Sequence, residues 1–201
     1  MSAIKRVALT GGIATGKTHI RKQFESLGVP TIDSDSLSRD AVAPGTPGLA
    51  QVIQRFGPDV LDATGALDRR KLGSIVFSDP AARRDLEAIV HPHVRAATEQ
   101  WFASLDPAIP FAVADIPLLY EVGRDRDFDI VVVAATNPGD QLRRVMGRDD
   151  LSEADARSRI AAQLPLEDKV KRADYVIWTD LGFDETDRQV RRIHDRIAAN
   201  G

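Results

Sequence analysis

The chain has 201 residues, a net charge of −3 and no cysteine. This length is sufficient for a full hydrophobic core, so we expect one domain with insertions rather than two domains. The missing cysteines exclude disulfides, thiolate zinc sites and a cysteine nucleophile, and the slightly acidic balance disfavours nucleic-acid binding, which needs a basic face. The longest aliphatic run (130–135) is too short to cross a membrane, and the N-terminus lacks the apolar stretch of a signal peptide. We therefore expect a cytoplasmic protein with neither a nucleic-acid nor a membrane partner.

Five apolar runs along the chain are typical of buried strands. They are separated by helical patterns, such as the one over 17–27, where Ile20, Phe24 and Leu27 share a face and Gly28 ends the helix. The runs are nearly continuous rather than alternating, which indicates a parallel sheet covered on both faces. The sequence therefore predicts an α/β fold with a five-stranded parallel sheet flanked by helices, its strands at 6–10, 29–33, 111–119, 128–135 and 174–178.

Two long segments show helical patterns and no strand. The first, 35–106, carries four apolar stripes separated by turn residues, and it is too long to be a loop. The second, 138–172, is rich in arginine, and Ser152–Asp155 has the spacing of a helix capping box. We therefore divide the chain into a core (1–34, 107–137 and 173–201), a helical insertion (35–106) and a second helical segment (138–172).

A phosphate-binding loop follows the first strand. Gly11, Gly16, Lys17 and Thr18 fit the pattern G-x-x-x-x-G-K-[ST], with a strand before and a helix after it. Glycines let the backbone wrap closely around phosphates, and the helix N-terminus points its amides at the anion. Lys17 is expected to neutralise the β- and γ-phosphates of ATP, and the Thr18 hydroxyl to bind Mg²⁺.

Carboxylates at the ends of two other predicted strands are candidates for the same site. Asp33 and Asp35 end the second strand, where open α/β sheets bind ligands; either could instead cap the next helix. Asp115 ends the third strand, just before Ile116 and Pro117, and is a candidate to hold Mg²⁺ through water. Because no Asn-Lys-x-Asp motif follows, a GTPase is disfavoured. A small-molecule kinase, a motor or switch ATPase, and a non-catalytic nucleotide-binding module remain open.

With these residues assembled, the chain resembles the dephospho-coenzyme A kinase family along nearly its whole length. The matching pieces are "ALTGGIATGKT", "IDSDSLSRDAVAPGTPG", "FGPDVLDATGALDRRKLGSIVF", "IVHPHV", "DIPLLYE", "RDDLSEADARSRIAAQLPLEDK" and "ADYVIW". The resemblance implies transfer of the ATP γ-phosphate to the ribose 3′-hydroxyl of dephospho-CoA, the last step of CoA synthesis, on a P-loop kinase fold. It also implies that 35–106 is a CoA-binding insertion and 138–172 a mobile lid. The alternative is another P-loop small-metabolite kinase, similar to the nucleoside monophosphate kinases.

The resemblance also assigns roles to single residues. Asp33 matches an aspartate near the acceptor hydroxyl, and Arg148 an arginine that closes over the transferring phosphate; Arg144, on the same helical face, is its rival. The ATP phosphates are assigned to Gly11, Gly12, Ile13, Ala14, Thr15, Gly16, Lys17 and Thr18. The acceptor is assigned to Asp35, Arg39, His91, Leu118, Tyr120 and Glu121. We expect a monomer that uses ATP, dephospho-CoA and Mg²⁺.

Four further expectations concern conformation and packing. Ala14 stands where the family often has glycine, and it should be tolerated only with a negative φ. His91, placed between two helices, could cap a helix instead of binding substrate. Strand 29–33 should lie beside the strand that precedes the phosphate loop. Finally, Trp101, Phe128 and Trp178 should belong to the core rather than stack on a ligand.

Overall fold

The computed structural model of the chain describes residues 4–199 and divides into two compact units. The first unit comprises Met1–Asp33 and Leu105–Gly201. The second, Ser34–Ser104, comes between the two halves of the first in sequence.

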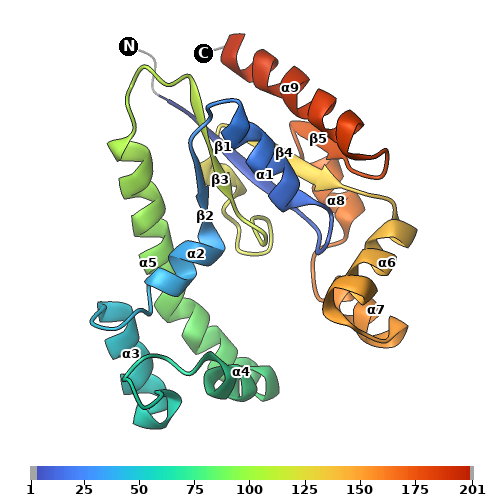
Figure 1. Cartoon of the computed structure of the whole chain (residues 1–201). Helices are drawn as coiled ribbons and strands as arrows, with labels where there is room; N and C mark the ends of the chain where they lie inside the picture. Colours follow the sequence, from blue (N-terminus) through green and yellow to red (C-terminus); the bar gives the residue numbers. More distant parts are fainter. Residues whose placement is uncertain (1–3, 200–201) are drawn as a thin grey trace. The chain divides into compact units, whose positions relative to one another are not determined.

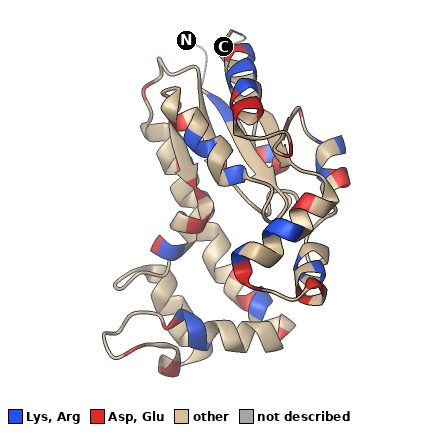
Figure 2. Cartoon of the chain, turned by 45° about the vertical axis from the view of Figure 1, so that its right-hand side comes forward, with Lys and Arg blue, Asp and Glu red and all other residues tan. Residues whose placement is uncertain are grey.

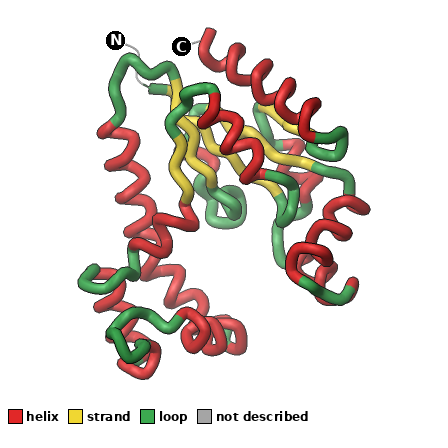
Figure 3. The backbone as a smooth tube through the Cα atoms, in the orientation of Figure 1, coloured by secondary structure: helices red, strands yellow, loops and turns green. Residues whose placement is uncertain are grey.

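A five-stranded parallel sheet forms the centre of the first unit (Figure 3). Its strands are β1 (Lys5–Gly11), β2 (Thr31–Asp33), β3 (Phe111–Asp115), β4 (Ile130–Ala135) and β5 (Tyr175–Trp178). The predicted α/β fold with a five-stranded parallel sheet is thereby confirmed. Because all strands run the same way, their carboxyl ends meet at one edge of the sheet.

The strand order is β2-β3-β1-β4-β5, which corrects the expectation that the second strand borders the first. β3 lies between them and pairs with both. All five residues of β3 are buried, so this strand needs a neighbour on each side. The three residues of β2 are only partly buried, which suits the edge of a sheet.

Helices α1 (Lys17–Ser26) and α9 (Phe183–Ala199) pack against each other and cover one face of the sheet (Figure 1). Ile20 and Phe24 of α1 are fully buried against apolar strand residues. Three further helices, α6 (Pro138–Asp149), α7 (Glu153–Ala161) and α8 (Leu166–Lys171), occupy the arginine-rich segment. The Asp155 amide donates a 3.2 Å hydrogen bond to Ser152 Oγ, so the predicted cap of α7 is present.

The second unit contains α2 (Ser34–Asp40), α3 (Pro47–Phe56), α4 (Arg69–Ser78) and α5 (Pro80–Ser104). These helices surround a core of their own, formed by Val42, Val52, Val60 and Leu72. Helix α5 runs without interruption through Pro92, so His91 lies inside a helix and not between two. Leu86, Ile89 and Val90 pack on the core from one face of α5, and this packing outweighs the hydrogen bond lost at the proline.

Acidic and basic residues are interspersed along the helices (Figure 2). Within residues 4–199, none of the helices combines the length and the apolar character needed to cross a membrane. Trp178 is 41% exposed, which corrects its expected place in the core. It is the last residue of the edge strand β5, where one side of the strand has no partner strand to cover it.

Candidate active site at the carboxyl edge of the sheet

Neighbouring strands bring two predicted site residues together. Asp33 and Asp115 are the last residues of β2 and β3, and they pair directly in the strand register. On its other side, Asp115 pairs with Leu9 of β1, two residues before the phosphate loop begins. Parallel pairing therefore aligns the two carboxylates with that loop.

The loop needs glycine for two physical reasons. A Cβ on Gly11 would lie 2.6 Å from both the Ala134 carbonyl oxygen and Thr15 Oγ1, so no side chain fits there. Gly16 has a φ of +86° and forms the N-cap of α1 without a side-chain cap. The first amides of α1 are therefore left for an anion, in the manner of phosphate-binding loops.

Ala14 has a φ of +58°, which corrects the expectation of a negative value. The left-handed conformation costs an L-residue roughly 1–2 kcal/mol, because Cβ approaches the following carbonyl oxygen. The surrounding loop holds the residue there. The neighbouring Thr15 Oγ1 donates a 2.9 Å hydrogen bond to the Gly12 carbonyl and so closes the turn.

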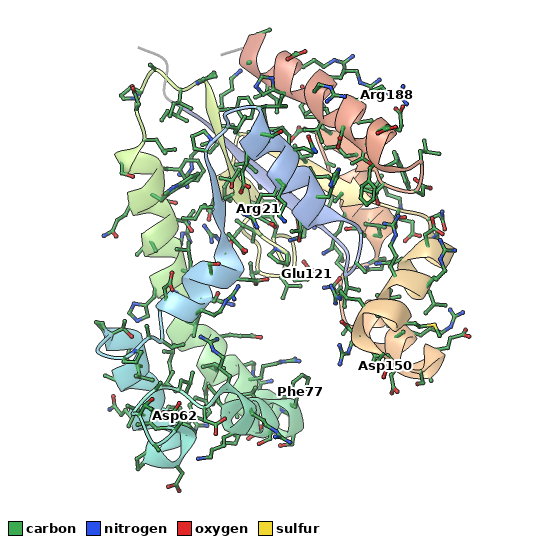
Figure 4. All side chains as sticks on the ribbon, viewed as in Figure 1. Arg21, Asp62, Phe77, Glu121, Asp150 and Arg188 are labelled. Atoms are coloured by element: carbon green, nitrogen blue, oxygen red, sulfur yellow. The ribbon has the colours of Figure 1, made fainter. Side chains whose placement is uncertain are left out.

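Two cations from α1 meet the two strand-end carboxylates. Lys17 Nζ donates a 2.5 Å hydrogen bond to Asp115 Oδ1. Arg21, which Figure 4 labels, lies one turn further along α1. It places Nε 3.5 Å from Asp115 Oδ2 and Nη2 3.9 Å from Asp33 Oδ2. Burial raises the pKa of the Asp115 carboxyl against the opposing effect of Lys17; nearby Asp33 raises it further, and Arg21 lowers it.

The oxygen donors around the loop fit a magnesium ion. The Thr18 side chain is exposed at the start of α1, and the Asp115 carboxylate lies beside Lys17. Within residues 4–199, there is no group of three or more His, Cys, Asp or Glu side chains that could hold a metal ion. Magnesium typically binds one or two protein oxygens together with substrate phosphates and water. The Thr18 hydroxyl and the Asp115 carboxylate are donors of this kind.

Side chains from the arginine-rich segment hold the loop from outside. Gln141 of α6 donates a 3.0 Å hydrogen bond to the Ile13 carbonyl, and Gln163 accepts one of 2.7 Å from the Ile13 amide. Arg144 donates to both Oγ1 and the carbonyl of Thr179, at 2.8 and 2.7 Å. Thr179 in turn donates to the Thr15 carbonyl at 3.0 Å. The loop is therefore hydrogen-bonded to this segment both directly and through Thr179.

Arg148, the predicted closing arginine, is exposed near the end of α6. Its guanidinium donates two hydrogen bonds to the neighbouring Asp149 carboxylate, at 2.8 and 3.0 Å. Arg159 of α7 donates to the same carboxylate at 2.9 Å. These hydrogen bonds, led by those from Arg148, lower the pKa of Asp149. Its rival Arg144 is bonded to Thr179, whereas Arg148 is bonded to Asp149, within the segment that carries it.

A cavity of about 430 Å³ opens beside the loop. The rings of His19 and Phe183 lie 4.7 Å apart at its wall, and Phe183 is 73% exposed. Its other lining residues include Ala14, Gly16, Arg143, Arg144, Thr179 and Asp180. The cavity is thus bordered by both the phosphate loop and the β5–α9 turn.

The three predicted acceptor residues after β3 have different surroundings. Leu118 is exposed, whereas Tyr120 is buried and lies under the Arg172 guanidinium, 4.1 Å from the ring centre. Burial raises the pKa of Tyr120 to about 12. Glu121 Oε1 forms a 2.7 Å ion pair with Lys169 Nζ, and it accepts a 3.0 Å hydrogen bond from the Leu164 amide.

The predicted acceptor residues of the second unit lie on two helices. β2 ends at Asp33, so Asp35 lies on α2 and not at the strand end, which corrects its expected place. Asp35 and Arg39 are exposed on this helix, where Arg39 Nε donates a 3.1 Å hydrogen bond to the Asp35 carbonyl. His91 is exposed on α5. It lines a mostly apolar cavity of about 300 Å³, whose other polar residues are Ser38, Arg69 and Glu87.

A phosphate loop on a parallel sheet, with strand-end carboxylates beside it, defines the class of P-loop nucleotide-binding proteins. A family model for dephospho-CoA kinase matches residues 5–185. The dephospho-CoA kinase of Cutibacterium acnes is 47% identical over 97% of this chain and 85% of its own length. The chain belongs to the dephospho-CoA kinase family.

Solved structures agree with this membership. A Thermus thermophilus crystal structure superposes with a TM-score of 0.82 at 31% identity, covering 97% of this chain and 98% of the other. The dephospho-CoA kinase of Campylobacter jejuni superposes with a TM-score of 0.68 at 26% identity, with 98% of each chain covered.

Four polar residues of this site were missed by sequence reasoning: Arg21, Gln141, Gln163 and Lys169. Arg21 has a local signal, because it lies four positions after Lys17 and therefore shares its helix face. The other three contact the loop from segments 128 or more residues away along the chain, and no local pattern announces such contacts.

Proposed function

We propose that the protein transfers the γ-phosphoryl group of ATP to the ribose 3′-hydroxyl of dephospho-CoA, yielding CoA and ADP in the last step of CoA biosynthesis. The observation that carries the proposal is the family match over residues 5–185, which spans the phosphate loop and its opposing carboxylates. The bond between the γ-phosphorus and the β–γ bridging oxygen breaks, and a bond from the 3′-oxygen to that phosphorus forms. The hydroxyl proton must leave as this bond develops.

The phosphate loop, Gly11 to Thr18, is the proposed ATP-phosphate site. Its backbone amides and the start of α1 face the anion, and Lys17 supplies a cation. In the structure this cation is paired with Asp115. Lys17 is therefore already within reach of the site, and binding of the phosphates exchanges one anionic partner for another.

Asp33 is the proposed catalytic base or orienting group. A carboxylate within hydrogen-bond reach can align a hydroxyl and accept its proton. The Asp33 side chain is 25% exposed, so it is open to a substrate, whereas that of Asp115 is 4% exposed. Arg21 lies beside both carboxylates, with Nη2 3.9 Å from Asp33 and Nε 3.5 Å from Asp115. Asp35 remains the rival for this role.

Thr18 and Asp115 would hold the magnesium ion that accompanies ATP. When bound, the ion neutralises phosphate charge and orients the triphosphate. The residues of the chain do the remaining work: they align the hydroxyl, hold the phosphates and exclude water.

Segment 138–172 is the proposed lid, with Arg148 as the arginine that reaches the transferring phosphate. Water must be excluded, because it would otherwise take the phosphoryl group in place of the acceptor. Arg148 is bonded to Asp149 within the lid itself. It can therefore exchange that carboxylate for a phosphate without breaking a contact to the sheet.

The cavity beside the loop suits the nucleotide base. Its His19–Phe183 wall offers flat, partly apolar surfaces next to the phosphate site. For the acceptor we propose the second unit, which corresponds to the predicted insertion 35–106. Its cavity combines an apolar lining with Arg69 and His91, which suits a long, mixed-polarity chain. On the β3 side, Leu118 is exposed to a ligand. Tyr120 would act through Arg172, and Glu121 through its buried partner Lys169.

We also propose that the working form is a cytoplasmic monomer with ATP and dephospho-CoA as its only partners. The reaction consumes ATP, which the cytoplasm supplies. The small net charge of −3 and the interspersed charges support a small polyanionic ligand over nucleic acid. Sedimentation equilibrium at micromolar concentration tests the monomer directly.

The test of the function is a coupled ADP-release assay against a panel of acceptors: dephospho-CoA, adenosine, nucleoside monophosphates, shikimate, gluconate and water. We expect the highest kcat/KM with dephospho-CoA. A higher value with a nucleoside monophosphate would replace the proposal by the alternative small-metabolite kinase. ADP release that is independent of any acceptor would indicate an ATPase.

A further inference from the structure

Lys169 is a buried cation that the proposed transfer does not use. Among residues 4–199 it is the one lysine or arginine classed as buried, with a side-chain exposure of 0%. It lies on α8, within the proposed lid. A charge at this depth is strongly unfavourable unless it is paired and fully hydrogen-bonded, so its contacts need a reason.

The Lys169 ammonium has an acceptor for each of its three protons. Nζ lies 2.7 Å from Glu121 Oε1, and it donates hydrogen bonds to the carbonyls of Gly11 at 3.2 Å and Pro117 at 3.4 Å. Gly11 ends β1 at the first residue of the phosphate loop, and Pro117 follows β3. One side chain therefore joins α8 to two strand ends at the active-site edge.

Glu121 extends this connection to the chain before α8. Its Oε1 atom also accepts the 3.0 Å hydrogen bond from the Leu164 amide, and Figure 4 shows Glu121 in the segment that follows β3. Gln163, the residue before Leu164, accepts a hydrogen bond from the Ile13 amide of the phosphate loop. The base of the lid is thus bonded to the phosphate loop at both Gly11 and Ile13.

We propose that Lys169 is a positioning residue for phosphoryl transfer: its ammonium, paired with Glu121, fixes the Gly11 carbonyl and so ties the phosphate loop to the base of the lid. This inference rests on the proposed kinase function. A buried ion pair contributes little stability over apolar residues of similar volume. Its effect is therefore expected on the geometry of the loop, where a displacement of about 1 Å can lower a rate by roughly 100-fold.

The test uses the full chain and the variants Lys169→Met and Lys169→Met/Glu121→Gln. Methionine fills the volume of the lysine side chain, and the double variant leaves no unpaired buried charge. The matched control is Lys171→Met, because Lys171 lies on the same helix but is 74% exposed and pairs with Asp168. For each protein we would measure Tm, kcat, KM for ATP and dephospho-CoA, and amide hydrogen exchange of peptides that cover the phosphate loop.

For the double variant we expect kcat to fall about 10- to 100-fold, with the KM for ATP within about threefold of wild type. Exchange should accelerate in the phosphate loop and around Leu164, and stay unchanged in β4 and α9. The Lys171→Met control should match wild type in every readout.

Wild-type kcat in a folded double variant would overturn the proposal. So would exchange that accelerates uniformly over the sheet, or failure of both Lys169 variants to fold, because Lys169 would then be a structural residue. A wild-type enzyme that does not phosphorylate dephospho-CoA overturns the proposed function instead. In that case, amide hydrogen exchange in the phosphate loop of the wild type and the double variant, measured with and without ATP, still tests the inference.

Discussion

Asp33 and Asp115 stand side by side at the ends of β2 and β3, and the Arg21 guanidinium contacts both carboxylates, at 3.9 and 3.5 Å. The two carboxylates differ in exposure, since the Asp33 side chain is 25% exposed and that of Asp115 only 4%. Neighbouring carboxylates with unequal solvent access are suited to different tasks: one can meet a substrate hydroxyl while the other stays beside Lys17 and a metal.

Replacing Asp33 with asparagine keeps the shape of the side chain and removes its charge. General-base catalysis contributes about 10²–10⁴-fold, or roughly 3–5 kcal/mol of barrier. We expect kcat for Asp33→Asn to fall by about that factor, with the Kd for ATP nearly unchanged. Steady-state kinetics and nucleotide titration measure the two quantities. A loss of only a few fold, together with a large loss for Asp35→Asn, would transfer the role to Asp35.

Lys17→Ala removes the cation of the phosphate loop. We expect kcat to fall about 100-fold or more, because the phosphate charge that develops in the transition state loses its partner. The chain should stay folded, since Lys17 belongs to the site rather than the core. Circular dichroism and ADP-release kinetics check both points. Lys22→Ala, an exposed lysine of the same helix, is the control and should be unchanged. Unchanged turnover in folded Lys17→Ala would exclude the role.

Arg148 should act mainly in the closed state. We expect Arg148→Ala to lower kcat by about tenfold or more, while the Kd for ATP stays within about threefold, because Arg148 is bonded to Asp149 of the same segment and not to the phosphate loop. Arg157→Ala, on exposed α7, serves as the control for the lid. Equal losses of affinity and turnover would make Arg148 a ground-state contact. Arg144→Ala should also free Thr179, and it should therefore weaken nucleotide binding as well.

Ala14→Gly should stabilise the chain. Glycine relieves the left-handed strain at φ +58°, which is worth roughly 1–2 kcal/mol, but it also raises the entropy of the unfolded chain by about 0.4–1 kcal/mol. We expect a net gain of about 0.5–1 kcal/mol in the free energy of unfolding, measured by urea titration. A loss of stability would show that the Ala14 methyl group makes contacts that outweigh this strain.

The raised pKa of Asp115 predicts a pH dependence of stability. Burial favours the protonated carboxyl in the folded state, so this contribution is fully present below the ordinary aspartate pKa and is lost as the pH rises through the raised one. The free energy of unfolding of Asp115→Asn relative to wild type should therefore increase from about pH 4 upward and then level off. Urea titrations between pH 3 and 8 measure this difference. A difference that decreases with pH would mean that Lys17 and Arg21 outweigh burial.

Much of this site was predictable because it depends on local sequence. The phosphate loop is a contiguous pattern, and the apolar runs that surround it can form only buried strands. The order of the strands was not predictable in this way. Asp33 borders Asp115 rather than the phosphate loop, because fully buried β3 needs partners on both sides and short β2 does not.

The side-chain environment of the phosphate loop also could not be predicted from local sequence patterns. The positive φ of Ala14 is imposed by the loop around it, and no propensity of alanine announces it. Lys169 reads as one member of an ordinary charged helix, yet it is fully buried because Gly11, Pro117 and Glu121 converge on it from elsewhere in the chain. The partners of Glu121, Lys169 and the Leu164 amide, are likewise visible only in three dimensions.

The most direct test of the central claim is to identify the product of the reaction. Wild-type protein would be incubated with ATP, Mg²⁺ and dephospho-CoA, and the product analysed by mass spectrometry and ³¹P NMR. The account predicts one added phosphoryl group per dephospho-CoA, as a monoester on the ribose 3′-oxygen, formed in equal amount to ADP. ADP without a phosphorylated acceptor, or a phosphate on another hydroxyl, would contradict it.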